Sequence, residues 1–71
     1  MQVTEYWVRP VNADGDSLEV YYCDTKKQAI AERDYRTDDH TDAVDWKLEK
    51  VVRKYNNGGD IIDEYIAIVE W

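Results

Sequence analysis

Apolar and polar residues alternate near the start of the chain. Leu18, Val20 and Tyr22 alternate with their neighbours between residues 17 and 23, a period of two that is typical of a β-strand. Residues 3–11 are rich in β-branched and aromatic side chains, and an Asp-Gly pair, which readily supplies positive φ, lies between the two segments. The pattern predicts a first hairpin that pairs residues 3–11 with 17–23. Pro10 cannot donate a ladder hydrogen bond, which fits a strand end close to the turn.

A helix is predicted next. Thr25-Lys26-Lys27-Gln28 has the form of a capping box, in which the Thr hydroxyl covers the amide of Gln28 and the Gln28 side chain reaches back. The residues that follow are mostly good helix formers. We therefore expect a helix over residues 26–36, with Ile30, Ala31 and Tyr35 facing inward.

Residues 41–55 fit two patterns. Their apolar side chains recur at helical spacing, but Val44, Trp46 and Leu48 also alternate as in a strand. A two-residue turn at Asn57-Gly58 would place Val44, Trp46, Leu48 and Lys50 opposite Trp71, Val69, Ala67 and Tyr65, on one nearly continuous apolar face. Residues 46–55 carry four bases and one acid, whereas residues 56–71 carry four acids and no base, so paired strands would attract. These observations favour a strand.

The chain of 71 residues is thus predicted to be one α+β domain, residues 1–71. We expect a four-stranded antiparallel sheet in β-β-α-β-β order with one helix on one face. A single helix can shield only one side of the sheet. The other face of the last hairpin would then show Lys47, Glu49, Val51, Ile62, Ile66 and Ile68. Ile62, Ile66 and Ile68 form the predicted face for a second copy or a partner.

Composition narrows the choice of partner. Sixteen acids against nine bases give a net charge of −7, and a protein that holds phosphates must supply cations. We therefore expect no direct binding to nucleic acid or membrane, and attraction to basic proteins instead. The single cysteine, Cys23, excludes an intramolecular disulfide and fits a reducing cytoplasm. No apolar run suits a signal peptide or a membrane span.

No group of polar residues has the spacing of a catalytic or metal site. His40 stands among Asp38, Asp39 and Asp42 without a second His or Cys, which favours a solvated acidic loop. The segment from Asn12 resembles the start of a calcium loop, but Ser17 and Cys23 occupy the positions of the required Gly and Glu. Asp60, Asp63 and Glu64 could be paired carboxylates for general acid–base catalysis, but no nucleophile, pocket or partner residue accompanies them in the sequence. We expect no catalysis, no metal and no cofactor.

The remaining feature is the acidic surface. It is predicted to dock against a basic channel through Asp14, Asp16 and Glu19 at the first hairpin and Asp38, Asp39, Asp42 and Asp45 in the long loop. Trp7, Tyr21 and Tyr65 would supply apolar anchors. A purely solubilising role for the charge stays open.

One resemblance adds to this reading. The segment Arg53-Lys54-Tyr55-Asn56-Asn57-Gly58-Gly59-Asp60-Ile61-Ile62-Asp63-Glu64-Tyr65, preceded by a short helix beginning Thr25-Lys26-Lys27-Gln28-Ala29-Ile30, resembles small phage-encoded proteins. Among these are anti-CRISPRs and other anti-defence inhibitors, many of them acidic and some of them nucleic-acid mimics. The resemblance implies an inhibitor, acting in the host cytoplasm, that occupies a basic nucleic-acid-binding site of a defence complex. The alternative is a small assembly protein that forms a homodimer through its exposed sheet face.

Overall fold

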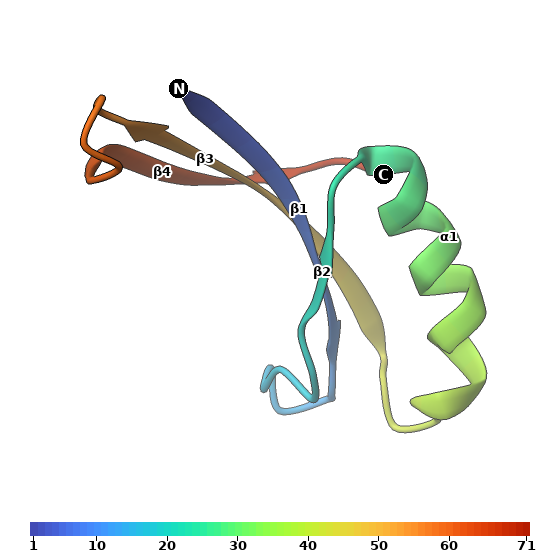
Figure 1. Cartoon of the computed structure of the whole chain (residues 1–71). Helices are drawn as coiled ribbons and strands as arrows, with labels where there is room; N and C mark the ends of the chain where they lie inside the picture. Colours follow the sequence, from blue (N-terminus) through green and yellow to red (C-terminus); the bar gives the residue numbers. More distant parts are fainter.

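The fold is an antiparallel sheet with one α-helix. The computed structural model describes all 71 residues. In chain order the elements are β1 (Gln2–Val11), β2 (Tyr21–Cys23), α1 (Lys26–Arg36), a 3-10 helix η1 (Thr37–Asp39), β3 (Asp45–Tyr55) and β4 (Ile61–Val69). In space the strands lie in the order β2-β1-β3-β4 (Figure 1).

The predicted α+β class, the four-stranded antiparallel sheet and the single α-helix are confirmed. The predicted β-β-α-β-β order does not match in full. The α-helix lies between β2 and β3, but η1 follows it before β3 begins.

The helix α1 has the predicted bounds and begins directly after the predicted capping box. The backbone N–H of Gln28 donates to Thr25 Oγ1 at 3.1 Å, and Gln28 Oε1 accepts from the backbone N–H of Thr25 at 3.3 Å. Of the three residues predicted to face inward, Ile30 is half-buried, but the prediction is wrong for Ala31 and Tyr35. Ala29 is the residue that α1 buries, whereas Ala31 is exposed and Tyr35 is 74% exposed. The small side chain of Ala29 lets the helix approach the sheet closely at Val8 and Leu48.

The core is small and centres on Val8, Ala29 and Leu48, from β1, α1 and β3. Six half-buried residues pack around it: Tyr6, Tyr21, Cys23, Trp46, Val69 and Trp71. Trp71 closes one side, since its indole N–H donates to the carbonyl of Trp46 at 2.8 Å. Only seven residues of 71 are buried, and the radius of gyration of 13.8 Å exceeds the ~11 Å expected for a compact chain of this length.

Both hairpin turns have the sequence Asn-x-x-Gly-Asp and the same hydrogen bonds. In each, the Asn N–H donates to the carbonyl of the Asp four residues on, and the Asn side-chain oxygen accepts two backbone N–H groups. The glycines Gly15 and Gly59 have φ of 86° and 85°. This geometry is a type I turn followed by a residue in the left-handed region. The expected two-residue turn at Asn57-Gly58 is therefore wrong.

The β3–β4 register is shifted by two residues from the prediction. Leu48 lies opposite Val69 and Lys50 lies opposite Ala67. The longer turn and a bulge between the pairs Lys54–Asp63 and Tyr55–Ile61 together account for the shift. Because the shift from Leu48 to Lys54 is an even number of residues, the side chains of this part of the ladder keep their predicted face. The strand assignment for β3 is confirmed.

The second strand is shorter than the predicted 17–23. Ser17 forms an isolated bridge with Val11, and the ladder resumes only where Tyr21 lies opposite Val8. Between these pairs three residues, 18–20, oppose two, Arg9 and Pro10, so the register shifts by one residue. Pro10 contributes to the break. Its carbonyl accepts from the N–H of Leu18 at 2.9 Å, but Pro10 has no N–H to return.

Candidate partner-binding site

The structure gathers the two predicted acidic segments at one end of the sheet. We call this set the acidic end: Asp14, Asp16, Glu19, Asp38, Asp39, Asp42 and Asp45. The N–H of Val44 donates to the carbonyl of Val11 at 2.8 Å, and Asp45 lies opposite Val11 in the β1–β3 ladder. The β1–β2 turn and the loop after η1 therefore adjoin (Figure 1).

Most carboxylates of the acidic end have no cationic partner. All seven side chains are exposed, and Asp39 alone forms an ion pair, with Arg36 at 3.5 Å. Arg36 also binds Glu32 at 2.8 Å. Asp45 accepts only the N–H of the next residue, Trp46, at 2.8 Å. Negative charge at this end is thus left largely uncompensated.

His40 anchors the loop of the acidic end. Its ring lies edge-on to the rings of Tyr21 and Trp46, each with centroids 5.7 Å away, and its Nε2 is 2.5 Å from the Tyr21 hydroxyl. The expectation that His40 stands in a solvated loop is wrong, because the residue is half-buried and its ring contacts side chains of β2 and β3. Its partners are distant in sequence, so no local signal indicates them.

Tyr21 lies within electrostatic reach of both acidic segments. Burial is the main cause that raises the pKa of its hydroxyl, while Arg36 lowers it. Glu19, Asp39 and Glu32 each raise it further. Glu19 from the first hairpin and Asp39 from the loop thus both act on the Tyr21 hydroxyl, which agrees with the proximity of the two segments.

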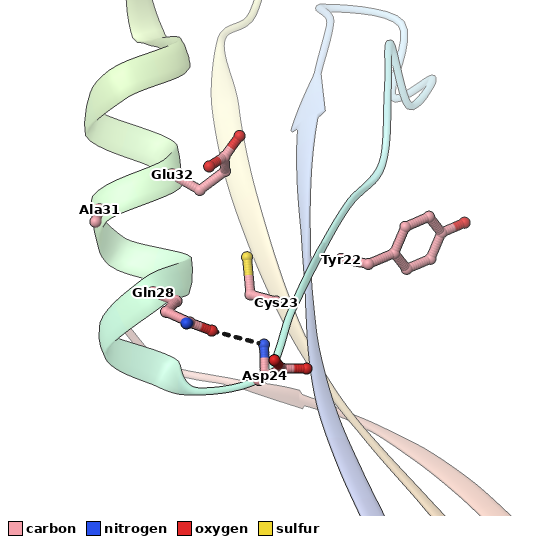
Figure 2. Close-up of a pocket in the computed structure, with 6 residues that line it drawn as sticks. All are labelled: Tyr22, Cys23, Asp24, Gln28, Ala31 and Glu32. Atoms are coloured by element: carbon pink, nitrogen blue, oxygen red, sulfur yellow. Dashed lines mark hydrogen bonds between the residues drawn. The ribbon is translucent and has the colours of Figure 1, made fainter.

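A shallow, open hollow of about 420 Å³ lies between β2 and α1. Figure 2 shows the thiol of Cys23 and the carboxylate of Glu32 beside it, and the Tyr22 ring pointing away. Burial raises the pKa of the Cys23 thiol, and Glu32 and Asp24 raise it further. A raised pKa disfavours the thiolate, which is the nucleophilic form. The hollow therefore has no activated nucleophile.

On the sheet face away from α1, charges are paired. Arg53 binds Glu64 at 3.0 Å and Glu5 at 3.3 Å, and Arg9 binds Glu49. Both guanidinium groups lie over the Trp7 ring, at 5.8 Å and 5.7 Å from its centroid. Of the three predicted aromatic anchors, Trp7 thus lies on this face, while Tyr21 and Tyr65 pair with residues on the other one. The three do not form one surface.

The predicted isoleucine face is exposed. Ile62, Ile66 and Ile68 have exposed fractions of 63%, 46% and 76%. Ile66 lies opposite Val51 and Ile68 opposite Glu49, on the face away from α1. Ile62 falls at the bulge and has no direct partner in β3.

No three His, Cys, Asp or Glu side chains are placed to hold a metal ion together. At the calcium-like segment the Asn12 side chain is engaged by the backbone of its own turn. No helix is long and apolar enough to span a membrane. Comparisons with family models, curated proteins and solved structures gave no match.

Proposed function

We propose that this chain is a non-catalytic inhibitor that inserts its acidic end into the basic nucleic-acid-binding site of a host protein. One observation carries the proposal: six of the seven carboxylates at the acidic end have no ion pair, whereas Glu5, Glu49 and Glu64 on the sheet face are neutralised by arginine. Unbalanced charge at one end steers the molecule toward a basic surface. The phage anti-defence type implied by the resemblance fits this role.

The anchored loop supports the same function. A flexible loop loses conformational freedom when it binds, and that loss weakens the complex. His40, held between Tyr21 and Trp46, reduces the freedom of the loop that carries Asp38, Asp39 and Asp42. Carboxylates presented in a fixed arrangement can bind arginine side chains in the manner of phosphates.

The experiment compares three tagged baits in bacterial lysate: the parent chain, an acidic-end variant and a charge-matched control. The acidic-end variant carries Asp38→Asn, Asp39→Asn and Asp42→Asn. The control carries Asp24→Asn, Asp63→Asn and Glu70→Gln, three exposed acids elsewhere. Both variants remove three negative charges. Captured proteins are identified by mass spectrometry, with and without added double-stranded DNA or tRNA.

We expect the parent and the control to capture the same nucleic-acid-binding protein, and the acidic-end variant to lose it. Added nucleic acid should displace the captured protein, and association should slow steeply as the Debye length falls below ~10 Å. Equal capture by both triple variants would show that the acidic end is not the binding site. Capture that nucleic acid cannot displace would refute the mimicry.

A further inference from the structure

The sheet has one long open edge. Its outer strands are β2, with three residues beside α1, and β4, with nine residues from Ile61 to Val69. β4 contains no proline, and no other element lies along its outer side. An uncovered edge of this length is a template for pairing with another chain.

The ladder shows which backbone groups face that edge. Met1 and Tyr55 exchange two hydrogen bonds, at 3.0 Å and 2.7 Å, so the odd residues of β3 bond toward β1. The even residues of β3 then bond toward β4, where their partners are odd. The N–H and C=O groups of Glu64, Ile66 and Ile68 consequently point to the free edge, and no proline blocks them.

Charge distinguishes a second copy from other occupants. Residues 45–69 hold five acids and four bases, whereas residues 1–44 hold ten acids and five bases. The β3–β4 hairpin is therefore nearly neutral, and Glu64 is already bound to Arg53. Two such hairpins can meet without the repulsion expected from a net charge of −7. The large radius of gyration and the thin core indicate that the chain alone leaves burial incomplete.

We propose that two copies pair β4 with β4, antiparallel, about a two-fold axis at Tyr65. In this register Glu64 faces Ile66, Asp63 faces Ala67 and Ile62 faces Ile68, so no like charges oppose within Ile61–Val69. Asp60 and Glu70 face each other just beyond the two ends of the strand. An axis at Glu64 would oppose two glutamates inside the strand, and an axis at Ala67 would pair only residues 65–69 of β4.

An axis at Ile66 avoids like charges but places Ile62 opposite Glu70. The axis at Tyr65 is central to β4 and pairs the full strand. It also brings the two half-exposed Tyr65 rings together in a non-hydrogen-bonded pair, where side chains approach most closely. The result is a continuous eight-stranded sheet with both acidic ends free.

Sedimentation equilibrium of the full chain tests the assembly. We expect a monomer–dimer equilibrium. If the protein remains monomeric at all concentrations up to about 500 µM, the proposal is overturned. Ile66→Glu and Ile66→Lys test the register, because both remove the same apolar side chain opposite the partner's Glu64. Ile66→Glu should raise the dimer Kd by more than about tenfold relative to Ile66→Lys, since two like-charge pairs form in each dimer.

Ile68→Glu and Ile68→Lys are the matched controls, because Ile68 faces the neutral Ile62 of the other copy. Their dimer Kd values should differ from each other far less than those of the Ile66 pair. If both Ile66 variants dissociate equally, the isoleucines pack face to face and the strand pairing is wrong. Circular dichroism confirms that each variant stays folded.

A disulfide gives an independent measurement. Opposed residues in a non-hydrogen-bonded pair have Cα atoms ~4.5 Å apart, within the ~4.4–6.8 Å that a disulfide spans. In a Cys23→Ala background, Tyr65→Cys should form a covalent dimer on mild oxidation, and Ala67→Cys should not. Equal cross-linking of both variants, or of neither, would overturn the register. All these variants keep the acidic end intact, so a failure here leaves the proposed inhibitor function untouched.

Discussion

The two hairpins share a turn and differ in almost everything after it. Both turns begin with an asparagine that binds the backbone and end with a glycine at positive φ. The β3–β4 ladder then runs nearly unbroken to Val69, although most of β4 is exposed. The β1–β2 ladder breaks at once, although it borders the core.

The difference shows that continuity of a ladder and burial are separate properties. A turn fixes only where pairing starts. The first ladder breaks where Pro10 lacks a donor and one extra residue shifts the register, while β4 supplies every donor from Asp63 to Val69. Packing against the core beside α1 therefore supports the short strand β2, whereas the largely exposed β4 is held mainly by its long ladder with β3. Four measurements test this contrast.

The largest loss of stability should come from a change at Leu48, because β3 pairs with β4 in its own hairpin and with β1 of the other hairpin. Leu48→Ala removes a side chain that is 1% exposed and should lower the free energy of unfolding by about 3 kcal/mol. Ile68→Ala changes an exposed position of the same hairpin and should lower the free energy of unfolding by less than about 0.5 kcal/mol. Urea denaturation at a concentration where the protein is monomeric measures both; similar losses would contradict a core centred on Leu48.

The two glycines should respond alike. Gly15→Ala and Gly59→Ala meet no neighbouring atom within 4 Å, so only the positive φ opposes the new Cβ. Each should cost about 1–2 kcal/mol in thermal or urea unfolding. A loss at Gly59 well above that at Gly15 would mean that the long ladder depends on its turn more than the short one does.

Alkaline pH should weaken the first hairpin. The pKa of Tyr21 is raised, chiefly by burial, so the folded state favours the protonated hydroxyl. Stability is then full below the unfolded pKa of about 10 and falls as pH rises through the higher folded pKa. Tyr21→Phe should reduce this fall and leave the part that comes from Cys23, whose pKa is also raised. Tyr65→Phe, which retains Tyr21, should keep it; an unchanged pH profile in Tyr21→Phe would contradict the assignment.

The smallest change in stability, within about 1 kcal/mol, should follow Pro10→Val, which restores one N–H at a buried position. If the missing donor breaks the ladder, the amides of residues 18–20 should gain protection from hydrogen exchange. Unchanged exchange would show that another feature ends the pairing after Ser17.

Local patterns predicted the parts of this fold whose causes are local. The capping box of Thr25 and Gln28 predicts the start of α1, the helix formers after it predict its extent, and alternation around Trp46 favours the strand β3. Turn length was misjudged because Asn56, rather than the Asn57-Gly58 pair, organises the turn. The sheet faces survived that error because the register moved by an even number of residues.

The acidic residues could be named from the sequence, but their arrangement could not. The segments that carry Asp14 and Asp42 adjoin only because β1 pairs with β3, and that pairing joins distant parts of the chain. The ring contacts of His40 depend on the same pairing, which brings both Tyr21 and Trp46 within reach of the imidazole. No spacing rule within one segment predicts contacts of this kind.

The central β1–β3 pairing also bears on how the chain folds. Each hairpin can close through its own short turn, but the ladder from Val11 opposite Asp45 to Gln2 opposite Lys54 must join the two halves of the chain. Closing such a long loop costs conformational entropy before its contacts form, which slows folding. Refolding should therefore wait for these central strands to meet, and their amide hydrogens should exchange last, after the outer strands have opened.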